Sequence, residues 1–132
     1  MLAYFPQVYP DELLYSVLAR YHRHMGAPSP IQSLEALFGR RLVVASVDLP
    51  GGLQQLAQRI PPGAGWTVDR LVGELTLLPY YAAFQPAGVA RQARRALHKG
   101  RAGGLLARLG MAAFRVPRVT RLRFCATCLV EM

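Results

Sequence analysis

The chain has 132 residues, of which 52% are hydrophobic, and its formal net charge at pH 7 is +9. This length predicts one domain with a core, and no run approaches the roughly 18 apolar residues of a membrane-spanning helix. Residues 1–84 contain six basic and six acidic residues, whereas residues 85–132 contain ten basic residues and one acid. Such an asymmetry favours a polyanionic partner, most simply nucleic acid, although a solubilising surface or a face that meets an acidic protein would have the same composition.

Two helices are predicted near the N-terminus. Pro10, Asp11 and Glu12 suit the first turn of the first helix, because proline tolerates that position and acids favour the positive end of the helix dipole. Gly26 should end this helix. Its apolar face has side chains at helical spacing: Leu13, Leu14, Val17, Leu18, Tyr21 and Met25.

The second helix has a well-marked start, in which Ser29 is the N-cap, Pro30 takes the first position and Gln32 completes a capping box. Its apolar face is Ile31, Leu34, Leu37 and Phe38, and Gly39 should end it. The short connection from Gly26 predicts a helical hairpin or a helix-turn-helix. The outer face offers Gln32, Ser33, Glu35 and Ala36. Because none of these is basic, we expect this helix to pack against its neighbours rather than to read DNA.

The next stretch should contain two more helices. Residues 42–47 form an apolar run that suits a short strand or a buried loop. Asp48 should cap a third helix and Thr67 a fourth. Their inward side chains are Leu53, Leu56, Ala57, Ile60, Val68, Leu71, Val72 and Leu75. Residues 76–81 should end the fourth helix in an aromatic cluster that reaches Phe84, and we expect this cluster in the hydrophobic core.

A fifth helix, over residues 86–100, differs from the others in charge. Its apolar stripe is thin and consists of Val89, Ala93, Ala96 and Leu97. The rest of its surface carries Arg91, Arg94, Arg95 and Lys99, with no acid to pair with them. This helix is the best candidate in the chain for contacts with phosphate, although a solvated basic face would have the same pattern. A joint at residues 101–104 and a short helix with Leu105, Leu106, Leu109 and Met111 should follow.

Both cysteines lie close to the end of the sequence, where Cys125 and Cys128 are separated by two residues. This spacing presents two thiolates to one ion and is half of a tetrahedral zinc site. Two incidental thiols or a redox pair are the alternatives. We expect the remaining ligands outside this chain, which would make it a fragment. Three arginines that flank the pair, Arg118, Arg121 and Arg123, join the predicted nucleic-acid-binding residues.

Signals of catalysis are missing from the sequence. It has no Gly-rich phosphate loop, no GxSxG motif and no paired acids in a loop. We therefore expect no enzyme, and a metal-dependent nuclease or transferase is disfavoured because there is no cluster of catalytic acids. The three histidines, His22, His24 and His98, are disfavoured as zinc ligands. The N-terminus lacks a basic signal-peptide region, and the only two cysteines are at ligand spacing, so we expect a protein of the reducing cytoplasm with no membrane partner.

Several segments resemble the TnsD/TniQ family of transposon target-site selection proteins. The most specific is residues 9–22, Tyr-Pro-Asp-Glu-Leu-Leu-Tyr-Ser-Val-Leu-Ala-Arg-Tyr-His. The others follow in the family's order: Leu37–Gly39, Val47–Pro50, Leu75–Tyr81 and Leu122–Leu129. Between the cysteines stand Ala126 and Thr127, where the family often has proline after the first cysteine.

The resemblance implies a mainly α fold with a helix-turn-helix-like N-terminal part. A helical TniQ-like domain would cover residues 1–116, near-neutral up to residue 84 and arginine-rich from residue 85. Residues 117–132 would begin a zinc-knuckle module, with Cys125 and Cys128 as the first ligand pair and a later Cys/His pair completing the site.

The resemblance also implies a function without catalysis. Family members select a target for DNA transposition, either a DNA site or an RNA-guided CRISPR effector complex, and recruit the AAA+ ATPase TnsC. We therefore expect a target-selection adaptor with DNA, a TnsC-like ATPase and Zn²⁺ as partners, and with a second copy of itself as a further candidate. The alternative is a stand-alone zinc-containing helix-turn-helix DNA-binding regulator.

Overall fold

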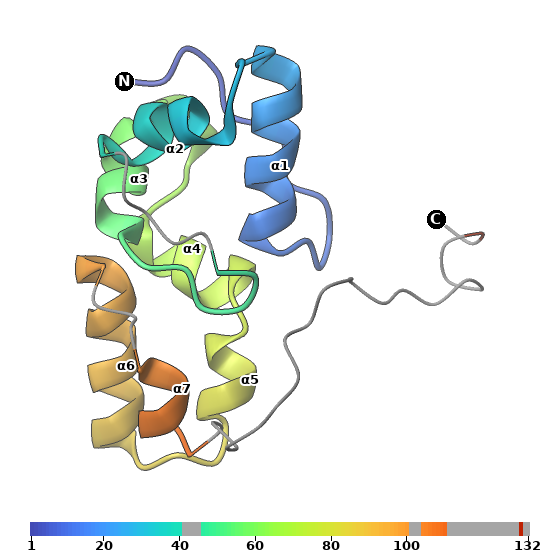
Figure 1. Ribbon diagram of the computed structural model, residues 1–132. Helices are drawn as coiled ribbons and strands as arrows, with labels where there is room; N and C mark the ends of the chain where they lie inside the picture. The colour runs from blue at the N-terminus through green and yellow to red at the C-terminus, as the bar shows by residue number, and fades with distance from the viewer. Residues whose placement is uncertain (41–45, 101–103, 111–129, 131–132) are drawn as a thin grey trace.

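The computed structural model describes residues 1–40, 46–100, 104–110 and 130, and this part of the chain is helical with no strand. Figure 1 shows α4 in the middle of the view, with α1, α2 and α3 above it and α5, α6 and α7 below it. The α-helices are α1 (Leu14–Met25), α2 (Pro30–Phe38), α3 (Leu53–Arg59), α4 (Val68–Leu75), α5 (Leu78–Ala82), α6 (Ala87–Lys99) and α7 (Leu105–Arg108). A 3₁₀ turn, η1 (Pro62–Ala64), precedes α4. The predicted mainly α fold is confirmed for these residues.

The helices pack around one hydrophobic core. Helix α2 contacts both α1 and α3, and α6 contacts α3, α4, α5 and α7. Most of the fully buried side chains come from five helices, and the largest of them are Phe38, Leu14, Leu37, Leu53, Leu56, Leu71, Leu97 and Leu109. In the described part of the chain, no helix combines the length and the apolar character that crossing a membrane requires.

Several predicted helix ends are confirmed by their capping contacts. The Ser29 hydroxyl accepts a hydrogen bond from the amide of Gln32 at 3.4 Å, and that of Thr67 accepts one from the amide of Arg70 at 3.3 Å. Gly26 ends α1 with φ +59°, which a side chain would disfavour. Local sequence therefore determines these boundaries, because each cap satisfies backbone groups within one turn.

The predicted start of the first helix is wrong. Helix α1 begins at Leu14, and its first turn contains no acid. Glu12 instead holds the side chain of Arg20, which donates to its two oxygens at 3.0 and 2.5 Å. Ser16 and the amide of Tyr9 also donate to this carboxylate, whose side chain is 8% exposed. A buried carboxylate needs these donors, and their geometry outweighs the benefit of the helix dipole.

Three side chains of α1 and α2 also differ in burial from the sequence prediction. Met25 and Ile31 are exposed, because each lies at the end of its helix, where no neighbouring element covers it. Ser33 is buried rather than outward, and its hydroxyl lies 2.8 Å from Nδ1 of His22. Helical spacing predicts the apolar face of each helix correctly in its middle. Which side chains are buried at its ends depends on how far the neighbouring helix extends.

The segment around Asp48 does not cap a helix as predicted. Helix α3 begins at Leu53 after Gly52, whose φ is +81°. Asp48 accepts a hydrogen bond from the amide of Leu49 at 2.9 Å and one from the hydroxyl of Ser46. Its other oxygen accepts from the hydroxyl of Tyr81 at 3.4 Å. Asp48 thus ties the loop before α3 to α5. The preceding predicted strand or buried loop lies largely outside the described residues.

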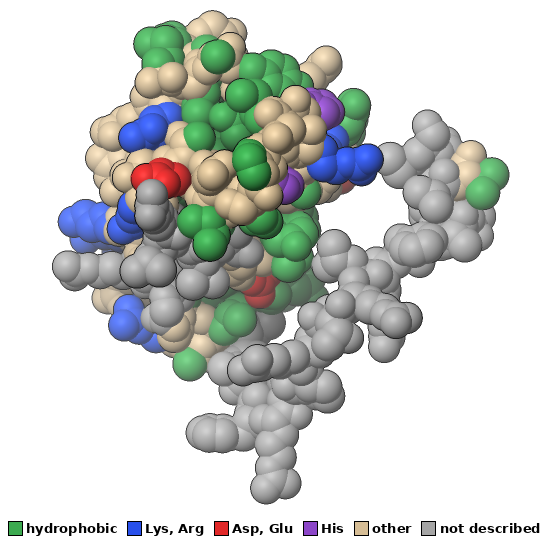
Figure 2. Space-filling view, turned by 45° about the horizontal axis from the view of Figure 1, so that its top comes forward, with side chains coloured by type: hydrophobic (Ala, Val, Ile, Leu, Met, Phe, Trp, Pro, Cys, Tyr) green, Lys and Arg blue, Asp and Glu red, His purple; other side chains and the backbone are tan. Residues whose placement is uncertain are grey.

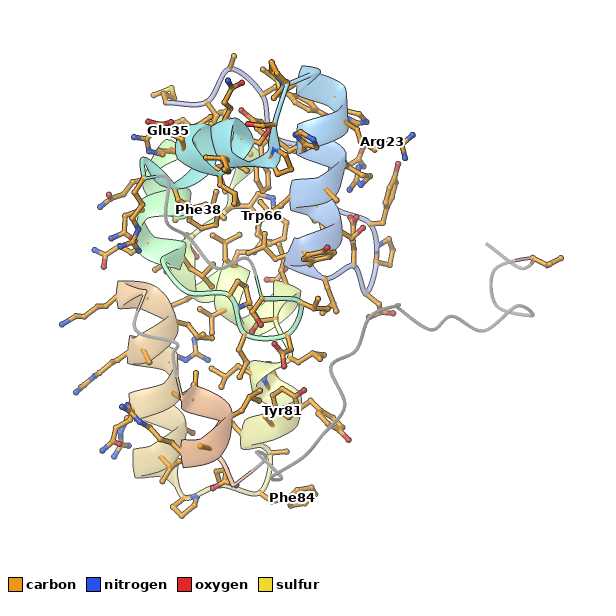
Figure 3. The ribbon with its side chains drawn as sticks, viewed as in Figure 1. Arg23, Glu35, Phe38, Trp66, Tyr81 and Phe84 are labelled. Carbon is orange, nitrogen blue, oxygen red and sulfur yellow. The ribbon has the colours of Figure 1, made fainter. Side chains whose placement is uncertain are left out.

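The aromatic cluster after α4 belongs only in part to the core, where the sequence predicts it. Leu78 is buried, but Tyr80 is 73% exposed and Phe84 is 99% exposed (Figure 3). The helical conformation is interrupted at Thr76, between α4 and α5. The buried hydroxyl of Thr76 donates to the carbonyl of Val72 at 2.7 Å and accepts from the amide of Leu78 at 3.2 Å. The next helix, α5, turns Tyr80 outward, whereas Tyr81 is half-buried and packs against the core.

Candidate nucleic-acid interface

Helix α6 presents one face to the core and the other to solvent. Its alanine-rich sequence favours a helix, and Gly100 ends it with φ +78°. Ala93, Ala96 and Leu97 are buried against the neighbouring helices. The predicted phosphate-contacting side chains, Arg91, Arg94, Arg95 and Lys99, are all exposed. The small size of the buried alanines brings the α6 backbone close to the core, so that the long cationic side chains extend from a fixed base.

One of these cations has an acid partner that the sequence did not indicate. Nη1 of Arg94 lies 3.1 Å from a carboxylate oxygen of Asp69, in the first turn of α4. Nε2 of His98 lies 3.5 Å from the same oxygen, too far for a good hydrogen bond. The expectation that the helix has no acid to pair with is therefore wrong for Arg94. The pair is exposed, so it is screened by solvent and holds Arg94 only weakly.

The other three cations of α6 differ from Arg94, which pairs with Asp69. Arg91, Arg95 and Lys99 make no ion pair with any acid in the described part of the chain. Three like charges that repeat along an exposed helix repel one another. This repulsion is relieved when an anion binds, which makes the row suitable for a chain of phosphates.

Sequence reasoning missed a cation that reaches the C-terminal end of α6. The guanidinium of Arg40 packs against Gly100 and Gly52, so closely that a Cβ atom at either glycine would collide with it. The amide of Gly52 donates to the carbonyl of Leu97 at 2.9 Å, which fixes this loop on the end of α6. Glycines at positions 52 and 100 are consistent with a close approach, but nothing local in the sequence identifies Arg40 as the residue that approaches.

The exposed cations are spread unevenly over the molecule. In Figure 2, most of the visible Lys and Arg side chains follow the left edge of the view. Arg23 lies on the outer side of α1, away from α6 (Figure 3). We define the α6 cationic face as Arg40, Arg91, Arg95 and Lys99.

Two other arginines are neutralised and do not belong to this face. Arg20 is paired with Glu12, and its guanidinium stacks 4.3 Å from the ring centre of Tyr9. Arg70 is paired with Glu74 at 2.8 Å and stacks 4.4 Å from the ring centre of Trp66. Because each charge is already met by a carboxylate, these arginines are poorly suited to bind phosphate.

The predicted zinc ligands, Cys125 and Cys128, and the flanking Arg118, Arg121 and Arg123 lie outside the described residues, so zinc binding stays a prediction. Among the residues that are described, no group of three or more His, Cys, Asp or Glu side chains could hold a metal ion. Nδ1 of His22 is engaged with Ser33, and Nδ1 of His24 lies 3.0 Å from the Tyr4 hydroxyl.

Comparisons with known proteins agree with this architecture. The model of the TniQ family matches residues 3–132. The Escherichia coli protein named transposon Tn7 transposition protein TnsD is 36% identical over 124 residues. The match covers 94% of this chain but 24% of TnsD, so the chain spans about a quarter of that relative. On the extent of the family match and this identity, the chain belongs to the TniQ family.

Proposed function

We propose that this chain acts in target-site selection during DNA transposition, as an adaptor without catalytic activity. Family membership and the name of its relative support a role in transposition. The observation that carries the proposal is the α6 cationic face, with Arg91, Arg95 and Lys99 unpaired within the described residues. An enzyme would need a cluster of reactive side chains, whereas a phosphate-binding surface needs only cationic side chains on a rigid helix.

The α6 cationic face binds the DNA backbone in this proposal. Arginine donates two parallel hydrogen bonds to a phosphate, and α6 holds Arg91 and Arg95 one turn apart on the same surface. Phosphate contacts position a protein on DNA without reading its sequence. Sequence-specific contacts would therefore come from another part of the protein or from an RNA-guided complex.

The remaining partners of the adaptor follow from the same proposal. A TnsC-like AAA+ ATPase binds the near-neutral N-terminal region and carries the signal to the transposase. Cys125 and Cys128 bind Zn²⁺ in this proposal. Thiolate ligands at this spacing suit a structural site rather than a catalytic one.

A targeted transposition assay tests this function. The full-length protein is supplied with its ATPase and transposase, and insertions at the selected site are counted. We expect the triple variant Arg91→Ala, Arg95→Ala, Lys99→Ala to lose most of these insertions, whereas Arg23→Ala keeps them. Equal insertion frequencies in the two variants would exclude a role for the α6 cationic face.

Association with the ATPase is measured separately. The full-length protein is used to capture the TnsC-like ATPase with and without ATP and DNA. Capture that persists in the triple variant would place the ATPase contact away from α6. Failure of capture under every condition, or metal-dependent cleavage of the DNA, would overturn the adaptor proposal.

A further inference from the structure

His98 is a titratable side chain of α6 that the proposed DNA contact does not use. This side chain is 23% exposed, and its Nε2 atom is buried without a hydrogen-bond partner among the described residues. A buried polar atom without a partner is uncommon, because it has lost its contact with water and has gained no hydrogen bond in return. Histidine is also the side chain that gains or loses a proton most readily near neutral pH. His98 is therefore a candidate for a role that depends on its protonation.

The carboxylate of Asp69 faces His98 from α4. Nε2 of His98 lies 3.5 Å from Oδ1 of Asp69, and Nη1 of Arg94 lies 3.1 Å from the same oxygen. Arg94 and His98 are four residues apart on α6, so their side chains are neighbours on one surface of the helix. Two side chains thus converge on one carboxylate oxygen. Arg94 holds this oxygen in the structure, and Nε2 is left too far away for a good hydrogen bond.

No acid other than Asp69 makes an ion pair with His98 in the described part of the chain. Helix α6 packs against α3, α4, α5 and α7, and of these only α4 contains acids, Asp69 and Glu74. Glu74 is already paired within its own helix. The other titratable or charged side chains on these four helices are Arg59, Arg70, Tyr80, Tyr81 and Arg108. On α6 itself, Arg94 and Arg95 lie within about one turn of His98 and oppose a positive charge there. Asp69 is therefore the side chain that favours the protonated form.

An approaching phosphate changes this balance. The side chains of Asp69 and Arg94 are 67% and 46% exposed, so solvent weakens their pair and a phosphate can compete for the guanidinium. Arginine donates two parallel hydrogen bonds to phosphate, a better match than its one contact with Asp69. When Arg94 moves to the phosphate, the carboxylate of Asp69 loses its cation and repels the DNA backbone. A proton on His98 removes this repulsion, because the imidazolium then pairs with Asp69.

We propose that DNA binding is coupled to the uptake of a proton by His98, which replaces Arg94 at the Asp69 carboxylate and releases Arg94 to a phosphate. This inference rests on the proposed DNA contact of α6, and it adds Arg94 to the cations that make that contact. The proton comes from solvent, resides on the imidazole and returns to solvent when the DNA dissociates. Because the complex holds more protons than the free chain, the affinity for DNA increases as the pH falls.

Fluorescence anisotropy of a labelled duplex measures this coupling when it is titrated between about pH 8 and about pH 5.5. One further phosphate contact contributes about 0.9 to the slope of log K against log salt concentration, which corresponds to up to about eightfold tighter binding at about 0.1 M salt. We expect the wild-type chain to gain this affinity as the pH is lowered. Calorimetric titrations in two buffers that differ in ionisation enthalpy should show proton uptake when the DNA binds.

Two variants should remove the coupling from opposite directions. His98→Gln cannot take up the proton, so its affinity should stay throughout at the value that the wild type has at the upper end of the pH range. Asp69→Asn frees Arg94 without a proton, so its affinity should stay at the value that the wild type has at the lower end. Both variants should lose the proton uptake, and circular dichroism checks that both keep the fold. His24→Gln removes an exposed histidine of α1 and is the matched control, which should retain the pH dependence.

The outcomes separate this inference from the proposed function. The same pH dependence in His98→Gln as in the wild type would overturn the coupling and leave the DNA contact of α6 in place. Affinity of the wild-type chain that does not change with pH would do the same. Absence of DNA binding at every pH would instead refute the proposed DNA contact, and the coupling with it.

Discussion

Replacing Arg91, Arg95 and Lys99 together by alanine should remove most of the affinity of this chain for DNA. The three side chains are exposed and unpaired in the described structure, so their loss leaves no buried charge behind. Alanine also favours the helix, which keeps α6 intact. The fold of the variant should therefore match that of the wild type, and circular dichroism checks this directly.

The expected magnitude follows from counterion release. Each phosphate contact on duplex DNA contributes about 0.9 to the slope of log K against log salt concentration, so three lost contacts reduce the slope by about 2.7. If the salt-independent part of binding is unchanged, this corresponds to about 500-fold weaker binding at about 0.1 M salt. The loss should be the same for DNA duplexes of unrelated sequence, because phosphate contacts carry no sequence information.

Fluorescence anisotropy of a labelled duplex, titrated at several salt concentrations, measures this slope. Arg23→Ala is the matched single-charge control, because Arg23 lies on α1 away from α6 (Figure 3). It is compared with Arg91→Ala, which should reduce the slope by about 0.9. An unaltered slope in the triple variant, or an equal effect of Arg23→Ala, would refute the assignment of phosphate contacts to α6.

The pairing of Arg94 adds a change in the opposite direction. Asp69→Asn removes the carboxylate that lies 3.1 Å from Arg94 and frees this arginine for phosphate. We expect the slope to become steeper, by at most about 0.9. A shallower slope in Asp69→Asn would mean that the pair positions Arg94 for DNA rather than withholding it.

Three further predictions concern stability. Gly73→Ala should raise the free energy of unfolding by about 0.5–1 kcal/mol, because a Cβ atom there meets only open space, and denaturation that shows a loss instead would contradict this. Burial alone would raise the pKa of Glu12, but hydrogen bonds from Arg20, Ser16 and Tyr9 and the charge of Arg20 lower it. Stability from this group is therefore present at neutral pH and is lost as the pH falls below about 4.3 through the lowered pKa, so Glu12→Gln should flatten the acid limb of a stability–pH curve. Thr76→Val should cost about 1–3 kcal/mol, since it leaves the buried carbonyl of Val72 and amide of Leu78 without their side-chain partner, and an unchanged denaturation midpoint would exclude that role.

The sequence allowed the helices other than α5, and the charge of α6, to be predicted, because both depend on neighbours within a few residues. The Ser29 and Thr67 caps and the Gly26 and Gly100 ends each satisfy backbone groups within one turn, so a local pattern is enough to locate them. The cationic surface of α6 follows from a spacing of three to four residues.

Tertiary structure decided which charges are free and which residues meet. Asp69 and Arg94 are 25 residues apart, and Arg40 reaches Gly100 from the segment just after α2, so no short window of sequence contains either contact. Glu12 lies outside the first turn of α1, contrary to the prediction, because its carboxylate pairs with the guanidinium of Arg20. Backbone propensities act over a few residues, whereas these pairings depend on distances that exist only after the helices have packed.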